Sequence, residues 1–577
     1  MIFCPKRQSW ASRNLNPCRL RWKTYSCVIM KSKAETEETG MQEKFARSRV
    51  LFVQYLKRDW KKIIIWILGL GLFSAGFVPA FEEIGKGQGL QGMYETMQNP
   101  AMISMVGPTP VETAADYTLG AMYAHEMLLF CGLFAMIIAA LHVVSHTRKE
   151  EDLGLTELVR SFQVGRQANS LAVIAEVVLI NFLLALVIGG VMTSYGADTI
   201  SADGAFLFGA SIGMAGILGA VIALVMAQIM PTSSGATGSS LGIVGLLYIL
   251  RAGTDVSNVD FSMINPMGWT YLAYPFTKNN WIPLIVAIVF SVIVVIIAFA
   301  LEGGRDMGAG YLSEREGRES AKKSLLSVPG LFTKLNKGVM ISWLIAFVIM
   351  GAAYGSIYGD MQAFLESNEV MSQMFTISGV SIEESFTGTI MMVLIGMVSI
   401  LPIAIVNKLF SEETRLHLSQ LYATKVTRAQ LYWTSVILAI AAGIVGILLA
   451  SGGLGATAIS AMGDRSSINM RDFFVAGYNF FPSVLFFTGL AALALGWAPR
   501  LGKAVYGYLG YSFALNYFGG ILDLPEWFAK TAVQSWIPRM PVDPFDAATF
   551  IAISVISVAL MVMGYMGYRK RDMVEGA

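Results

Sequence analysis

Long apolar runs alternate with short polar connections along this chain. Several runs reach about 20 residues, the length of an α-helix that crosses roughly 30 Å of hydrocarbon. Inside a bilayer each segment has to satisfy its own backbone hydrogen bonds, which favours helices. The pattern therefore predicts an all-α polytopic membrane protein with about twelve transmembrane helices.

The predicted spans fall into two sets of six. The first set is Ile63–Phe81, Thr118–Ser145, Asn169–Thr193, Gly204–Ile229, Ser239–Ala252 and Trp281–Leu301. The second set is Gly338–Tyr358, Gly388–Asn407, Gln430–Ser451, Phe473–Trp497, Ala504–Leu522 and Ala547–Tyr568.

Lys and Arg are distributed unevenly over the connections between these spans. With the N-terminus inside, only seven of the 42 basic residues fall outside: Lys86, Arg251, Lys278, Arg465, Arg471, Lys530 and Arg539. Membrane proteins keep such residues on the cytoplasmic side. We therefore expect a multi-pass protein of the cell (plasma) membrane with cytoplasmic N- and C-termini. The even number of spans that this requires supports the short span Ser239–Ala252.

An amphipathic segment precedes each set of spans. In Met41–Lys62, apolar residues recur at helical spacing among basic residues, which predicts a helix lying on an anionic leaflet. Residues 325–335 show the same apolar spacing before the seventh span. The basic residues 1–40 are predicted to be a disordered or non-native tail, with Met30 or Met41 as the native start; a transit peptide is the alternative.

Composition narrows the classes of function. Apolar residues make up 55% of the chain and charged residues 14%, against about 25% charged in ordinary globular domains. The net charge of +2 gives no reason to expect a nucleic-acid partner. Four cysteines without CxxC spacing indicate neither a disulfide framework nor a zinc site. Because P-loop, H-E-x-x-H and G-x-S-x-G sequences are absent, we assign no catalytic residue, metal ligand or cofactor, and no ATPase, to this chain.

Residues recur in the same order in both halves. Trp66 matches Trp343 at an offset of 277 residues, and Glu151 matches Glu413 at an offset of 262. Further matches follow in sequence, and the offset changes only in connections. This predicts two six-helix repeats, residues 41–310 and 311–577. Six spans per repeat give both repeats the same orientation, so they are expected to be related by a pseudo-twofold axis along the membrane normal.

The inside connection after the second span of each half carries the clearest pattern. The two segments are HTRKEEDLGLTELVRSFQVGRQ (146–167) and KLFSEETRLHLSQLYATKVTRAQ (408–430). Each starts with a Glu pair, continues with a short amphipathic helix and ends with Val-x-Arg. An acid and a base at its two ends can clamp such a helix parallel to the membrane, ready to dock a soluble partner; a solvated charged loop is the alternative. The candidate residues are Glu150, Glu151, Glu157, Arg166, Glu412, Glu413 and Arg428.

The order Glu-Glu, Gly-Leu, Glu-Leu, Val-x-Arg resembles the coupling segment of type 2 ATP-binding-cassette (ABC) permeases. The amphipathic helix before the first span and the outer segment Asn265–Trp269 leading to Pro275 also fit that family. Residues 41–577 as a whole resemble its fused, double-domain members described as exporters of polyketide antibiotics. In the second half Gly154 and Glu157 are replaced by Leu416 and Ser419, which leaves open whether both segments work equally.

The resemblance implies the permease of an ATP-driven exporter. Two copies of a separate ABC ATPase subunit, carrying ATP and Mg²⁺, would dock on the two coupling segments. A small hydrophobic or amphipathic, drug-like substrate would then move outward between the halves and the membrane lipid.

Four ionisable residues lie inside the predicted spans of the first half: His125, Glu126, His142 and Glu176. Such residues are costly in a membrane and often functional. His142 and Glu176 fall at similar depth and are expected to pair, either as a polar contact for substrate or as a structural link between helices. The alternative function is a twelve-span ion-coupled secondary transporter, which is disfavoured because spans 7–12 contain almost no buried acids.

Overall fold

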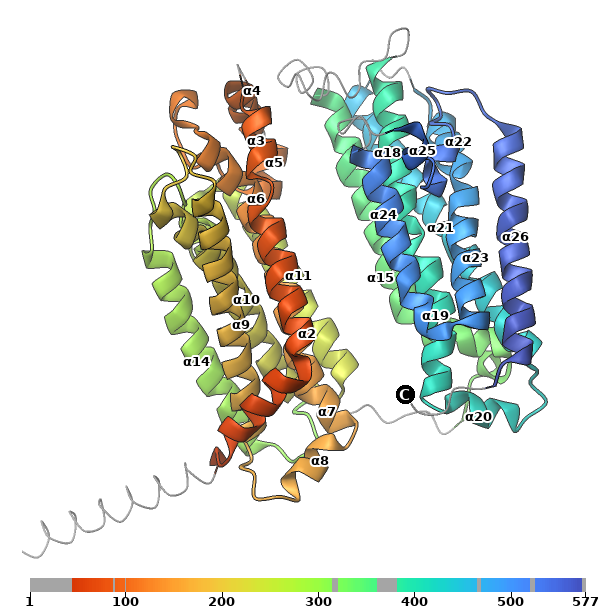
Figure 1. The fold of residues 1–577 in the computed structure, drawn as a ribbon, viewed down its shortest axis with the longest axis horizontal. Helices are drawn as coiled ribbons and strands as arrows, with labels where there is room; N and C mark the ends of the chain where they lie inside the picture. Colours follow the sequence, from red (N-terminus) through yellow and green to blue (C-terminus); the bar gives the residue numbers. More distant parts are fainter. Residues whose placement is uncertain are drawn as a thin grey trace, which may run out of the picture. The chain divides into compact units, whose positions relative to one another are not determined.

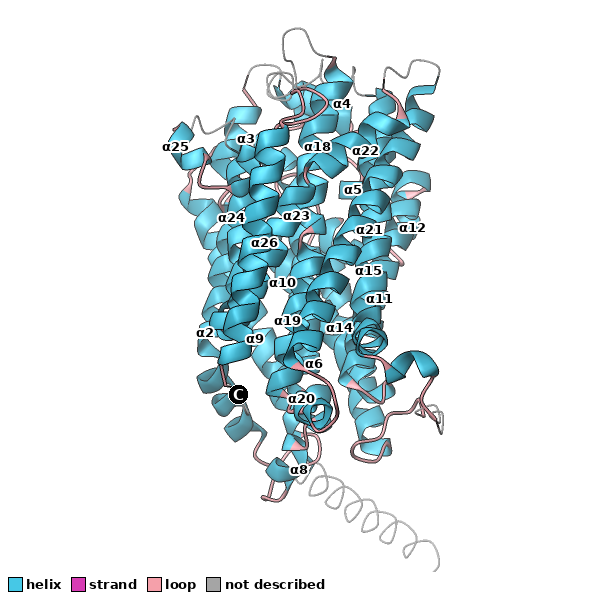
Figure 2. Ribbon diagram, turned by 90° about the vertical axis from the view of Figure 1, so that its right-hand side faces the viewer, coloured by secondary structure: helices cyan, strands magenta, loops and turns pink. Residues whose placement is uncertain are grey.

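The computed structural model describes residues 44–86, 89–98, 100–313, 320–360, 381–463, 468–518 and 525–572. The predicted tail, residues 1–40, lies outside them. All regular structure in the described residues is helical (Figure 2), as expected for an all-α polytopic membrane protein. The chain divides into two compact units, Met1–Arg315 and Glu316–Ala577.

Eleven helical stretches of the described residues are long and apolar enough to cross a membrane. In the first unit their helices are α2 (Ser48–Ala75) continued by α3 (Val78–Ile84), α6 (Leu119–His146), α9 (Ala168–Ser194), α10 (Ala202–Ile229), α11 (Ser233–Ser257) and α14 (Ile282–Gly304). In the second unit they are α15 (Val328–Ser356), α18 (Ile382–Val398) with α19 (Ile400–Thr414), α21 (Arg428–Met462), α22 (Met470–Asn479) with α23 (Phe481–Trp497), and α26 (Ala547–Lys570).

Each stretch overlaps one predicted span. The remaining span, Ala504–Leu522, begins as α24 (Ala504–Phe518), and residues 519–524 lie outside the described part. Shorter helices occupy the connections: α4 (Gly89–Met97), α5 (Pro100–Val106), η1 (Ala114–Asp116), α7 (Arg148–Asp152), α8 (Leu155–Arg160), α12 (Val259–Ser262), α13 (Gly268–Tyr271), η2 (Lys323–Leu326), η3 (Ile357–Asp360), α20 (His417–Tyr422), η5 (Pro499–Lys503), α25 (Glu526–Ala529) and η6 (Val533–Trp536).

The two predicted amphipathic segments run directly into the spans that follow them. Helix α2 continues from Ser48 into the first span, and its first turns run obliquely to the rest (Figure 1). Helix α15 begins at Val328, where the Ser327 hydroxyl accepts a hydrogen bond from the backbone N–H of Gly330 and Pro329 occupies the first turn. In each unit an amphipathic segment and a span therefore form one long helix.

Glycines allow the helices of each unit to pack closely. In α10 a Cβ on Gly209 or Gly213 would lie 2.5 or 2.7 Å from a carbonyl oxygen of α9. In α15 a Cβ on Gly351 would lie 2.4 Å from the carbonyl oxygen of Ala450 in α21. Lipid tails offer no hydrophobic drive for helices to associate, so close backbone contact between small residues supplies much of the attraction.

Candidate functional site

In both units the connection after the second span contains a short helix that follows a residue with a left-handed backbone conformation. Helices α7 and α8 follow α6 in the first unit, and α20 follows α19 in the second. The residue before α8 is Gly154, with φ 72°, and the residue before α20 is Leu416, with φ 62°. Leucine in this left-handed region costs roughly 1–2 kcal/mol, whereas glycine is unstrained. The second unit thus keeps the turn despite the replacement.

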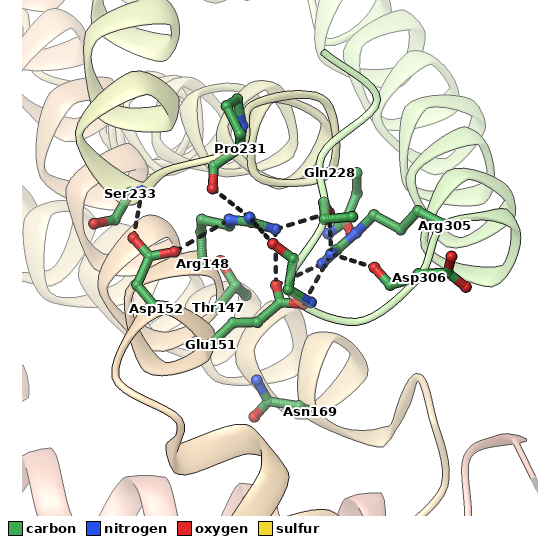
Figure 3. Close-up of polar contacts among 12 residues, drawn as sticks. Thr147, Arg148, Glu151, Asp152, Asn169, Gln228, Pro231, Ser233, Arg305 and Asp306 are labelled. Atoms are coloured by element: carbon green, nitrogen blue, oxygen red, sulfur yellow. Dashed lines mark hydrogen bonds and ion pairs between the residues drawn. The ribbon is translucent and has the colours of Figure 1, made fainter. Parts of the chain in front are cut away.

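Glu151 is bound to the end of the sixth span of its own unit (Figure 3). Arg305, the residue after α14, donates to Oε1 and Oε2 of Glu151 at 2.8 and 2.7 Å, and the backbone N–H of Gly308 donates to Oε1 at 2.7 Å. The guanidinium of Arg148, 1% exposed, lies 3.2 Å from Oε2 and also donates to the carbonyls of Gly308 and Ala309. Paired Arg–carboxylate hydrogen bonds of this kind are strong and directional.

The second unit repeats this ion pair. Arg571, the residue after α26, donates to both carboxylate oxygens of Glu413 at 2.5 Å. The side chain of Glu413 is 1% exposed and that of Arg571 is 15% exposed. In both units the second Glu of the pair therefore fixes the connection to the end of the sixth span.

The Arg of Val-x-Arg also binds the end of the sixth span of its unit. Arg166 donates to the backbone carbonyl of Arg305. Arg428 donates to the carbonyls of Tyr568, Arg569 and Arg571 at 3.3, 3.3 and 2.6 Å. Carbonyls at a helix C-terminus lack partners in the helix and attract cations. In the first unit, therefore, the acid and the base at the two ends of the connection both bind Arg305, the residue that follows the last span.

The first Glu of each pair has other partners. Glu150 lies 2.8 Å from the guanidinium of Arg58 and accepts a hydrogen bond from the Tyr55 hydroxyl at 3.2 Å, which links α7 to α2. Glu412 lies 2.8 Å from the Lys408 ammonium and 2.6 Å from Nδ1 of His417. Glu157 is exposed on α8.

The two connections expose different surfaces. Around α8 four large apolar side chains are 44–67% exposed: Leu153, Leu155, Leu158 and Phe162. Around α20 the exposed side chains include the polar or basic residues Arg415, His417 and Lys425. Leu416 is the large apolar side chain that is exposed there. An apolar patch rimmed by polar residues is typical of a protein contact surface.

The candidate intramembrane residues form two separate groups in the first unit. His142 Nε2 lies 3.2 Å from Glu176 Oε2, so these two are brought together. Near the other end of α6, His125 accepts from the Tyr117 hydroxyl at 2.9 Å and donates from Nε2 to the Gly107 carbonyl at 3.0 Å. Burial raises the pKa of Tyr117, helped by the nearby Glu126, so its hydroxyl keeps the hydrogen that it donates. Glu126 is partly buried, and its Oε1 has no hydrogen-bond partner among the described residues.

Sequence reasoning did not single out Arg305 and Arg571. The available signal was the sequence Arg-Asp-Met a few residues after the last apolar run of each half, at 305–307 and 571–573. It also missed Asp59 and His146, which lie 2.9 Å apart and join α2 to α6.

The fold and the repeated connections define a polytopic helical membrane protein with matching anchor points in its two units. A protein-family model described as the C-terminal domain of the multidrug efflux system permease Rv1217c matches residues 325–569. The multidrug efflux system permease protein Rv1217c of Mycobacterium tuberculosis is 25% identical over 525 residues, which cover 90% of this chain and 94% of that protein.

Proposed function

We propose that this chain is the membrane-spanning permease of an ATP-driven exporter of the type 2 ABC class. Similarity to a multidrug efflux permease over nine-tenths of the chain supports a role in drug efflux. The observation that carries the coupling proposal is the pair of Glu–Arg ion pairs, Glu151–Arg305 and Glu413–Arg571, which recur at the same place in both units. The substrate class is hydrophobic or amphipathic and drug-like.

In this proposal two copies of a separate ABC ATPase, which hold ATP and Mg²⁺, dock on α8 and α20 at the cytoplasmic side. Closure of the ATPases displaces the docked helices. Glu151 binds Arg305, the residue after α14, and Glu413 binds Arg571, the residue after α26. Each displacement therefore also moves the last span of its unit. Coupling of this kind needs stiff, specific contacts, and buried bidentate ion pairs supply them.

The exposed side chains make the two docking sites unequal. Leu158 and Phe162, 64% and 67% exposed, give α8 an apolar centre, whereas α20 offers mainly polar and basic groups. Energetically important contacts concentrate in apolar, desolvated centres of interfaces. The first unit therefore supplies the tighter ATPase contact in this proposal.

Co-purification tests the docking site. We expect Leu158→Asp with Phe162→Asp to reduce recovery of a candidate ABC ATPase with the chain in mild detergent at least tenfold, since a buried carboxylate opposes docking. Phe261→Asp is the matched control, because Phe261 is 58% exposed on α12, at the other end of α11 from α7. Full recovery and unchanged substrate-stimulated ATP hydrolysis in the double variant would contradict docking on α8.

A secondary transporter is the second candidate, favoured by the buried pair His142–Glu176. Such pairs can carry protons during ion-coupled transport. Substrate uptake into inverted proteoliposomes driven by a proton gradient, with no nucleotide present, would support this candidate over the exporter. Uptake that requires ATP and the partner ATPase would support the exporter.

A further inference from the structure

Titratable side chains from three helices form a buried chain at the α7 end of the first unit. Oε2 of Glu176, on α9, lies 3.2 Å from Nε2 of His142, on α6. The rings of His142 and His146 stack with their centroids 4.1 Å apart. Nε2 of His146 lies 2.9 Å from Oδ2 of Asp59, on α2. All four side chains are at most 9% exposed.

The hydrogen bonds of His146 indicate its protonation state. Nδ1 lies 2.9 Å from the carbonyl oxygen of His142, which can only accept. The Ser145 hydroxyl donates to that same carbonyl at 2.7 Å, so toward Nδ1, at 2.8 Å, it acts as an acceptor. Nε2 faces the carboxylate of Asp59. Both ring nitrogens therefore face acceptors, and only the doubly protonated imidazolium supplies a hydrogen to each.

The second unit has a permanent cation at the matching position. When the two halves of the sequence are aligned with the 262-residue offset of the connections, Lys408 corresponds to His146. With the 277-residue offset of the first spans, Asn336 corresponds to Asp59. Lys408 lies 2.8 Å from Glu412, and Asn336 is buried and donates to the Phe332 carbonyl within α15. Both units thus put a cation here, but only the first uses histidine, the side chain that ordinarily titrates near neutral pH.

We propose that His146 is a proton-binding site which fastens α2 to α6 while it holds its proton. The titratable and charged groups around it are Tyr55, Arg58, Asp59 and Lys62 on α2, His142 on α6, Glu150 on α7 and Glu176 on α9.

Loss of the proton removes the ion pair and leaves one ring nitrogen of His146 facing an acceptor without a hydrogen. Of its ion-pair partners in the described part of the chain, Asp59 then keeps Arg58 and Lys62, which lie on its own helix. The side chains of Arg58 and Lys62 are 47% and 73% exposed, so the proton that His146 loses passes to the water beside them. The site belongs to the first unit alone and does not depend on which energy source drives transport.

Spin labels test this site in the full chain in detergent micelles. With the four native cysteines replaced, one label goes at exposed Arg49 on α2 and one at exposed Leu158 on α8, and distances are measured at pH 6 and pH 8.5. At pH 6 we expect a single population with a short distance between the labels, in which α2 is held to α6 (the fastened population). At pH 8.5 we expect a second population with a longer distance, in which α2 has separated from α6 (the released population). The ratio of the two changes by up to about tenfold per pH unit, the limit for one linked proton.

Variants that copy the second unit provide the controls. His146→Lys, as at position 408, should keep the fastened population at both pH values, whereas Asp59→Asn, as at position 336, should give the released population at both. His142→Gln leaves the Asp59–His146 pair and should retain the pH response. Wild-type distances that do not change with pH would overturn the proposal. The same pH-dependent change in the Asp59→Asn variant would also overturn it. The Asp59→Asn variant provides this test even if the His146→Lys variant does not fold.

Discussion

At the residue scale, the short helices α8 and α20 are each preceded by one residue with a left-handed backbone conformation. The sequence showed that Gly154 is replaced by Leu416 in the second half, but it could not show that both residues adopt the same left-handed conformation. That conformation is set by the turn that the polypeptide makes between α7 and α8 and between α19 and α20. Local preference does not set it in the second unit, because leucine disfavours it.

The replacement can be tested in the first unit. Gly154→Leu should lower the free energy of unfolding by about 1–2 kcal/mol, since a side chain is strained at φ 72°. Apart from Gly154 and its two chain neighbours, no heavy atom of the described residues lies within 4 Å of a Cβ at this position, so crowding of the Cβ does not contribute. Gly154→Asn is the control and should cost less, because asparagine tolerates this region. Thermal unfolding in detergent measures both; equal stability of wild type and Gly154→Leu would contradict the strain.

At the element scale, the spans were predictable, and so was one tertiary contact, His142–Glu176, because the two residues fall at similar depth in neighbouring spans. The contacts of the connection with the last span were not predictable. Helix α6 begins at Leu119, one residue from the predicted start, because an apolar run of bilayer length has few alternatives. The ion pair Glu151–Arg305 joins residues 154 positions apart, and no local pattern encodes such a distance. Likewise, the amphipathic pattern before the first span did not show that this segment and the span form one helix, Ser48–Ala75, whose first turns run obliquely to the rest.

A double-mutant cycle tests whether Glu151 and Arg305 act as a unit. The two side chains are 8% and 9% exposed, and removal of one partner from a buried pair typically costs about 3–5 kcal/mol. We expect Glu151→Gln and Arg305→Gln each to destabilise the chain by that amount, and the double variant to lose much less than the sum. Chemical unfolding provides the free energies. Additive losses would mean that the two side chains act independently.

At the scale of the whole molecule, the proposed parallel repeat requires the connections after the second span of both units to lie on one side of the membrane. The positions of basic residues favour this arrangement, since only seven of 42 fall on the opposite side. The two Glu–Arg ion pairs show that each connection meets the end of the sixth span of its own unit. A single ATPase layer can serve both units only if these ends face the same compartment.

Thiol labelling in intact cells tests this topology. In a chain without native cysteines, Phe162→Cys and Ala423→Cys, both exposed in the structure, should react with a membrane-impermeant maleimide only after the cells are opened. Phe261→Cys, exposed at the other end of α11, should react in intact cells. Labelling of positions 162 and 423 from opposite sides would give the units opposite orientations. Two ATPases on one side could then not engage both connections, and the exporter proposal would fail with the parallel repeat.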